Sequence, residues 1–324
     1  MKNIFLISII FFCYSHNNFE SILMNDNLYT IISYYKFIKI ENIFKHKNIF
    51  NKYTKDLDCR GIILIAPEGI NLNLSMLTSQ SKIFIKRLSI LFKFLDNELK
   101  ISYSNKHIFR KLKIKVKEEI LTTRLQNQIN LNENIGDYIN PTKWDNFIKE
   151  PDVILVDTRN FYENEVGTFS NAVNPNARNF TELLIWLDKN ILNKKNKKKK
   201  IAMFCTGGIR CEKATSYLKV KGHANVFHLE GGILKYLEKI KGNNSWVGEC
   251  FVFDDRVTVD KNLNKGTFEL CFACRMPLSK TAIKNKKYIK GVSCHKCHGT
   301  KTQLQIDKYS MRNKQLKKIN NHER

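Results

Sequence analysis

Apolar residues in the first third of the chain recur with two different periods. Stretches that alternate, or that are short and continuously apolar, predict strands, and stretches with apolar residues three or four positions apart predict helices. The predicted strands are 30–40, 61–66, 70–75, 100–103 and 112–116, and the predicted helices are 42–57 and 79–95. The order is that of a ferredoxin-like βαββαβ unit, which we place at residues 29–117.

A second region with a different pattern covers residues 151–241. Continuous apolar runs predict strands at 153–156, 201–204 and 225–229, and helical spacing recurs at 181–192, after 208 and from 231 to 240. The basic run 194–200 is expected as a solvated loop. Strands that alternate with helices predict a doubly wound parallel sheet, whose ligand site lies beyond the carboxyl ends of its strands.

The segments outside these two regions are polar or short. Residues 118–150 are Asn-rich and weakly periodic, and we interpret them as a connector that ends in a helix starting at Pro141. Residues 242–306 form a small lobe that contains cysteine pairs. Residues 307–324 are expected as a frayed basic tail.

The first 28 residues are expected as an extension outside the fold. Lys2 precedes the apolar run 4–14, which is too short to cross a membrane. No cleavage site with small residues follows, which favours an extension or an upstream start before Met24. The alternative is a targeting peptide over residues 1–23. No other apolar stretch is long enough to span a bilayer, so no membrane partner is predicted.

Composition adds a class of partner to this architecture. The chain has 324 residues, is 43% hydrophobic and carries a net charge of +25. Two or three domains with real cores are expected, and the charge points to a polyanion such as RNA. An abundance of Lys, Asn and Ile also results from A/T-rich coding, which weakens the inference from charge alone.

One group of basic residues follows the second predicted helix. We interpret this group either as the solvated face of a strand or as a surface that binds a phosphate backbone. Its members are Lys106, His107, Arg110, Lys111, Lys113, Lys115 and Lys117.

The nine cysteines fit a reducing compartment better than a disulfide scaffold. Two C-x-x-C pairs, Cys271 with Cys274 and Cys294 with Cys297, are separated by 19 residues. This spacing is typical of a tetrahedral structural zinc site. The alternatives are four free thiols, or a site in which His295 or His298 replaces a cysteine ligand.

The most informative cysteine is Cys205, which follows the apolar run 201–204 and precedes a helical pattern. The loop Thr206, Gly207, Gly208 and Ile209 separates it from Arg210. Glycines, a helix N-terminus and a guanidinium all favour a thiolate, and therefore a nucleophile. Phosphatase loops that hold a phosphate are one residue longer, so this loop suits a single sulfur carried as a persulfide. Cys211 is either a resolving cysteine or a packing residue.

The string from Cys205 to Ala214, Cys-Thr-Gly-Gly-Ile-Arg-Cys-Glu-Lys-Ala, resembles the active-site signature of the rhodanese-domain tRNA uridine hydroxylases, the TrhO group. Further segments resemble landmarks of the same family, namely 32–37, 68–71, 157–159, 162–167, 228–233 and 251–257. Thr168 and Tyr236 depart from residues common in rhodaneses, His and Trp, and we interpret both as packing substitutions.

The resemblance implies a ferredoxin/acylphosphatase-like domain, a rhodanese domain and a cysteine-containing C-terminal part. It also implies oxygen-dependent hydroxylation of the wobble uridine of tRNA at C5, with Cys205 as the catalytic residue. The cytoplasmic location that we expect rests on the cysteine usage and not on the resemblance. Molecular oxygen would be a co-substrate with an unknown electron donor. The alternatives are a generic rhodanese sulfurtransferase, which carries sulfur as a cysteine persulfide, and a non-enzymatic RNA-binding scaffold.

Overall fold

The computed structural model describes residues 28–93, 98–124 and 134–322, and the side chains of residues 316–322 are not described. The chain divides into two units, Met1–Ile120 and Leu121–Arg324. The expected extension or targeting peptide at residues 1–23 lies outside the described residues. Among the residues that are described, no helix combines the length and apolar character that a bilayer crossing requires.

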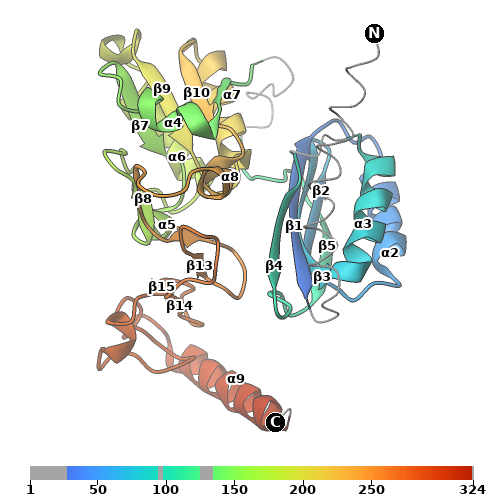
Figure 1. The fold of residues 1–324 in the computed structure, drawn as a ribbon. Coiled ribbons are helices and arrows are strands. Elements are labelled where there is room, and N and C mark those ends of the chain that lie inside the picture. Colours follow the sequence, from blue (N-terminus) through green and yellow to red (C-terminus); the bar gives the residue numbers. More distant parts are fainter. Residues whose placement is uncertain (1–27, 94–97, 125–133, 323–324) are drawn as a thin grey trace. The chain divides into compact units, whose positions relative to one another are not determined.

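The first unit has the predicted ferredoxin-like order, followed by the fifth strand that the sequence also predicted (Figure 1). Its elements are β1 (Tyr29–Phe37), α2 (Ile43–Thr54), β2 (Cys59–Ala66), β3 (Gly69–Leu77), α3 (Thr78–Leu91), β4 (Lys100–Ser104) and β5 (Leu112–Val116). The strand order is β4-β1-β3-β2-β5. β5 pairs in parallel with β2, whereas the other pairs are antiparallel. The acylphosphatase-like fold class is thus confirmed.

Alternation along these strands separates a core face from an opposite face. Both helices lie on one side of the sheet (Figure 1) and contribute Phe50, Phe84 and Leu88 to the core. The strands contribute every second residue to the same cluster, for example Ile32, Ile63, Leu72 and Leu74. Burial of each such side chain stabilises the fold by about 1.5–3 kcal/mol.

The second unit contains a four-stranded parallel sheet in the order β6-β10-β9-β7, which confirms the predicted parallel arrangement. Its elements are β6 (Asp137–Ile139), α4 (Pro141–Phe147), β7 (Val153–Asp157), α5 (Phe161–Asn164), β8 (Gly167–Phe169), α6 (Phe180–Asn190), β9 (Lys200–Phe204), α7 (Ile209–Val220), β10 (Val226–Leu229) and α8 (Gly232–Lys239). The basic run holds one short 3-10 turn, η2 (Lys194–Asn196).

Helices cover both faces of this sheet. One core cluster joins Leu184 and Leu187 of α6 and Leu218 of α7 to Met203 of β9. The opposite cluster joins α4 and α8 to the other side of the same strands, with members that include Trp144, Leu155, Phe204, Ile233 and Leu237. The sheet is therefore doubly wound, as predicted.

Two segments that were predicted without regular structure contain a strand and a helix. β6 lies inside the segment interpreted as a connector, because three residues with a charged Asp137 are too few to give a periodic pattern. The expected frayed tail is instead α9 (Gln303–His322), so that prediction is wrong over residues 307–322. Arg312 Nη2 donates to the carbonyl oxygens of Phe272 and Gly291 and attaches this helix to the cysteine lobe.

The segment between α8 and α9 consists of short antiparallel pairs. β11 (Trp246–Gly248) pairs with β8, β12 (Cys250–Phe251) with β13 (Thr258–Val259), and β14 (Glu269–Leu270) with β15 (Pro277–Leu278). A 3-10 turn, η3 (Ala282–Lys284), follows. The β14–β15 hairpin carries the first C-x-x-C pair.

Candidate active site and metal centre

Cys205 lies at the carboxyl end of β9, where the parallel sheet was expected to place its ligand site. Its side chain is fully buried, and the Gly208 backbone N–H donates to Sγ over 3.1 Å. Gly208 has a φ of 101°, which favours glycine over any residue with a Cβ. The chain can therefore turn from β9 into α7 within the loop 206–208.

The first turn of α8 sets the orientation of this loop. The backbone N–H groups of Ile233 and Leu234 donate to the carbonyl oxygens of Cys205 and Thr206, over 2.9 and 3.1 Å. Gly232 makes the approach possible, since a Cβ there would stand 2.6 Å from the Cys205 oxygen. Both carbonyls are thus engaged by α8. In the sequence, the only sign of this contact is the pair Gly231 and Gly232 ahead of a helical pattern.

Arg210 lies beside Cys205 and is paired with a carboxylate. Its guanidinium forms two hydrogen bonds with Glu163, Nη1 to Oε1 over 2.6 Å and Nη2 to Oε2 over 2.8 Å. Glu163 is fully buried and also accepts from the Asn160 backbone N–H and the Thr206 hydroxyl. This bidentate pair connects α5 to the first turn of α7. Glu163 is a site residue that sequence reasoning missed.

Electrostatics at the loop favour the thiolate form of Cys205. Burial alone would raise the pKa of the Cys205 thiol, but four interactions oppose it: a hydrogen bond from the Cys211 thiol, the charge of Arg210, and the backbone N–H groups of Cys211 and Gly208. Together they hold the pKa of Cys205 well below its usual range. Burial and the neighbouring Cys205 raise the pKa of Cys211, so Cys211 keeps its proton and donates it.

The positions of the remaining loop residues are consistent with this arrangement. Cys211 is fully buried in the core cluster, with Sγ 3.5 Å from the Thr158 hydroxyl. Thr206 is half-buried, and Ile209, also half-buried, is the first residue of α7. The thiols of Cys205 and Cys211 belong to one hydrogen-bonded group. The role of Cys211, as a resolving or a packing cysteine, stays a prediction.

Asp157 and Arg159 organise the neighbouring segment rather than the loop itself. Arg159 donates from Nε and Nη2 to the Asp157 carboxylate over 2.9 and 2.6 Å. The Thr168 hydroxyl donates to Oδ2 of the same carboxylate over 3.0 Å. Tyr236, the other departure from the rhodanese pattern, donates its hydroxyl to Asp145 over 2.7 Å. Both substitutions therefore supply hydrogen bonds and are more than packing residues.

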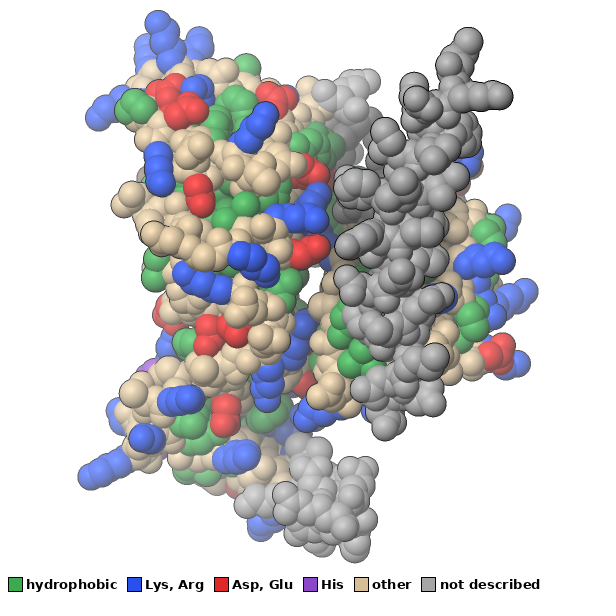
Figure 2. Space-filling view, in the orientation of Figure 1, with side chains coloured by type: hydrophobic (Ala, Val, Ile, Leu, Met, Phe, Trp, Pro, Cys, Tyr) green, Lys and Arg blue, Asp and Glu red, His purple; other side chains and the backbone are tan. Residues whose placement is uncertain are grey.

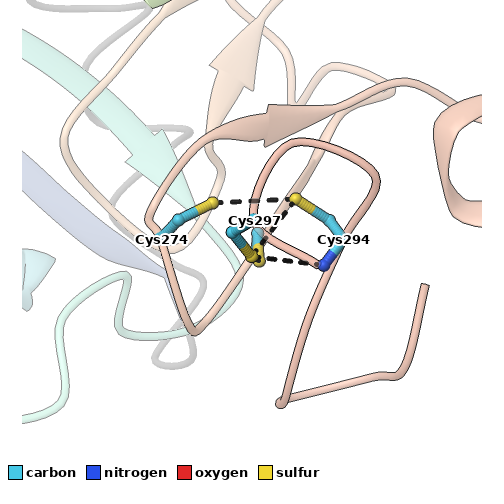
Figure 3. A group of neighbouring side chains, drawn as sticks. Cys274, Cys294 and Cys297 are labelled. Atoms are coloured by element: carbon cyan, nitrogen blue, oxygen red, sulfur yellow. Dashed lines mark hydrogen bonds between the residues drawn. The ribbon is translucent and has the colours of Figure 1, made fainter. Parts of the chain in front are cut away.

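The two C-x-x-C pairs converge on one point in the C-terminal lobe. All four sulfur atoms lie within 4.8 Å of one another. The separations are 3.9 Å for Cys271 to Cys297, 3.6 Å for Cys274 to Cys294 and 3.7 Å for Cys294 to Cys297. In Figure 3 the side chains of Cys274, Cys294 and Cys297 point toward one another.

These distances fit a tetrahedral thiolate site. Four sulfurs about 2.3 Å from a central zinc ion would be about 3.8 Å apart, close to the separations observed. His295 and His298 are exposed and lie outside the group. The four cysteines could therefore hold a metal such as zinc, without a histidine ligand.

Two family models match the first unit and the parallel-sheet part of the second unit. Residues 29–120 match the model described as UPF0176 acylphosphatase like domain, and residues 140–239 match the rhodanese-like domain. Among solved structures, a rhodanese-related protein from Thermoplasma volcanium is 25% identical and covers 33% of this chain and 95% of its own, with a TM-score of 0.26.

Curated relatives extend over almost the whole chain. Two proteins of Prochlorococcus marinus, from strains MIT 9215 and MIT 9515, are both named tRNA uridine(34) hydroxylase. The first is 42% identical over 306 residues, which are 92% of this chain and 98% of that protein. The second is 42% identical over 304 residues, which are 91% of this chain and 97% of that protein. The chain therefore belongs to the tRNA uridine(34) hydroxylase family.

Proposed function

We propose that this chain hydroxylates C5 of uridine 34 in tRNA, with Cys205 as the catalytic residue and molecular oxygen as co-substrate. The relatives of that name support the reaction. The role of Cys205 rests on one observation. Its buried sulfur accepts a hydrogen bond from the Gly208 N–H, and the surrounding groups hold the pKa of its thiol low. A thiolate in this setting is a nucleophile at neutral pH.

The reaction that suits a thiolate begins at C6 of the uracil ring. Attack by Cys205 forms a C6–S bond, and the electron pair of the C5–C6 double bond moves toward O4, which makes C5 electron-rich. C5 then takes one atom of molecular oxygen. Loss of the C5 proton and departure of the thiolate from C6 restore the double bond. The second oxygen atom leaves as water, so an external two-electron reductant and two protons are required.

In this scheme the surrounding residues act on Cys205 and not on the base. Cys211 donates its S–H to the thiolate form, and Gly208 donates its N–H. The Glu163–Arg210 pair fixes the position of the positive charge near the sulfur. Because Glu163 neutralises that guanidinium, Arg210 is expected to contribute less to thiolate stability than an unpaired arginine would.

The test of the reaction is direct. Full-length protein is incubated with tRNA that lacks modification at position 34, with a reductant, in air and under nitrogen, and the nucleosides are analysed by mass spectrometry. We expect one added oxygen at uridine 34 in air only. Oxygenation under nitrogen would refute the role of molecular oxygen, and absence of oxygenation with every reductant class would refute the reaction.

A second candidate function rests on the same loop. Four residues between Cys205 and Arg210 leave room for one sulfur atom on the cysteine, as in a rhodanese sulfurtransferase that carries a persulfide. Thiosulfate with cyanide as acceptor separates the two functions. Thiocyanate production at a rate matching or exceeding tRNA oxygenation would favour the transferase.

For the C-terminal lobe we propose a structural zinc ion bound by Cys271, Cys274, Cys294 and Cys297. Such a site supplies folding free energy, because the ligands are brought together only in the folded lobe. The lobe has a small core otherwise, consisting of these cysteines and a few neighbours such as Leu278 and Tyr288.

The expected result of ligand loss is specific to this lobe. Cys274→Ser should reduce bound zinc from about one ion per chain to a small fraction, and should expose residues 271–300 to proteases. Mass spectrometry of metal content and limited proteolysis measure both effects. Cys59→Ser, which removes a buried thiol from the first unit, is the matched control and should leave zinc content unchanged. Equal zinc content in both variants would refute the site.

We propose domain limits at 29–117, 151–241 and 242–306, and a cytoplasmic location.

A further inference from the structure

The sheet of the first unit has a second face, opposite α2 and α3, with a composition of its own. The strand registers place Ser33 and Tyr35 of β1 beside Asn73 and Asn71 of β3, and those beside Ile62 and Leu64 of β2. All six side chains are half-buried, and none belongs to the core cluster that the helices cover. Polar residues thus occupy the middle of this face.

Aromatic rings lie on the same face. Tyr35 and Phe37 both follow the outward alternation of β1, their ring centroids are 6.1 Å apart, and both are half-buried. Lys100 Nζ on the neighbouring strand β4 lies 4.9 Å from the Tyr35 ring centroid. Aromatic rings on a polar sheet face, with a cation beside them, are the arrangement on which unpaired bases stack.

Positive charge borders this face along β5. Lys113 pairs with Ile62 and Lys115 with Leu64, so both lysines share the face with Tyr35, and both are exposed. None of the residues in the five described strands is Asp or Glu, so no carboxylate of the strands offsets these charges. Lys and Arg side chains also project widely over the surface seen in Figure 2. The complementary partner is a polyanion.

The structure reduces the number of basic residues after the second helix that could contact phosphates. His107, one of these residues, is not available for a phosphate, because its ring nitrogens lie 2.9 Å from Ser75 Oγ and 2.9 Å from Asp58 Oδ2. Side chains along β5 alternate between the two faces of the sheet, which puts Lys113 and Lys115 on the face that also carries Tyr35. The polar, aromatic and basic residues then form one surface, which we call the open face: Tyr35, Phe37, Asn71, Asn73, Lys113 and Lys115.

We propose that the open face binds unpaired nucleotides of the tRNA substrate. A base stacks on Tyr35, the amides of Asn71 and Asn73 hydrogen-bond to base edges, and Lys113 and Lys115 contact backbone phosphates. The identity of the RNA rests on the proposed function. Stacking requires unpaired bases, so loops of the tRNA and not its helical stems are the ligand.

The test uses the full chain and an unmodified tRNA transcript, with affinity measured by fluorescence anisotropy at several salt concentrations. Tyr35→Ala is expected to weaken binding about tenfold, whereas Tyr35→Phe keeps the ring and retains affinity. In turnover, Tyr35→Ala should raise KM for tRNA and leave kcat unchanged. The double variant Lys113→Gln, Lys115→Gln should lower the slope of log Kd against log salt by about one to two.

A charge-matched control comes from the other side of the sheet. Lys45 and Lys52 are exposed residues of α2, so Lys45→Gln, Lys52→Gln removes the same charge at a distance from the open face. This variant should bind tRNA nearly as the wild type does. An equal loss in both lysine variants would mean that RNA responds to net charge alone and would overturn the proposal.

Other outcomes separate this proposal from the hydroxylase reaction. If the wild type hydroxylates tRNA and Tyr35→Ala shows the same Kd and KM, the open face is not the binding surface and the reaction stands. Competition by an acidic peptide but not by single-stranded RNA would identify a protein partner and overturn the proposal. A wild type that binds no tRNA overturns both. Thermal unfolding of each variant verifies that the first unit is folded.

Discussion

Cys205→Ser is expected to lower the rate of uridine oxygenation by at least about 1,000-fold, because a hydroxyl cannot replace a thiolate as the nucleophile. The structure makes serine a close steric substitute, so the backbone of the loop and the contacts from Ile233 and Leu234 should persist. Single-turnover oxygenation of unmodified tRNA, analysed by mass spectrometry, measures the loss. Binding of tRNA should be unchanged.

A second cysteine provides the control for this prediction. Cys59 is also buried, but burial raises the pKa of its thiol to about 12, so it stays protonated at neutral pH. Cys59→Ser should therefore keep full activity. A thiolate absorbs in the ultraviolet and a thiol does not, so the wild type should absorb more than Cys205→Ser wherever Cys205 is ionised. This difference should persist well below a pH of about 8.5, where a free cysteine protonates. Activity retained in Cys205→Ser would remove the sulfur from the mechanism.

Glu163→Gln is expected to destabilise the second unit by about 3–5 kcal/mol, since it leaves the buried Arg210 guanidinium without its carboxylate. The side chain of Glu163 is fully buried and that of Arg210 is 10% exposed, so water replaces little of the lost interaction. All three tryptophans belong to the second unit. Their fluorescence during denaturant unfolding therefore reports on this unit alone.

The control lies two residues away on the same segment. Glu165 is half-exposed and pairs with Lys296 at the surface, so Glu165→Gln removes the same charge and should cost no more than about 1 kcal/mol. Similar stabilities for the two variants would mean that the Glu163–Arg210 pair is solvated, in disagreement with the buried geometry. Hydroxylation by Glu163→Gln should also fall, because Arg210 loses its fixed position beside Cys205.

Periodicity was sufficient to predict most of the fold. The strand around Leu72 alternates apolar and polar residues and the strand around Met203 is continuously apolar, and their predicted and observed limits differ by a few residues. Cys205 was predicted at the end of a strand because an apolar run, glycines and a helical pattern follow one another in sequence. Such local signals need no knowledge of distant contacts.

Contacts between distant residues were not predictable in this way. Glu163 and Arg210 are 47 positions apart, and nothing in either local pattern indicates that they pair. The same reason applies to β6, which is a strand only because it pairs with β10. α9 has little apolar periodicity, and its attachment through Arg312 depends on carbonyl groups of the cysteine lobe. The convergence of the four cysteines, in contrast, followed from spacing alone.

The clasp between α8 and the reactive loop has a consequence for protein synthesis. The groups that hold the carbonyl oxygens of Cys205 and Thr206 belong to Ile233 and Leu234, which are translated later than the cysteine itself. A nascent chain on the ribosome cannot assemble the complete cradle before these residues have emerged. Until then α8 cannot hold the loop, so the loop geometry that directs the Gly208 N–H at the sulfur is fixed only late in synthesis.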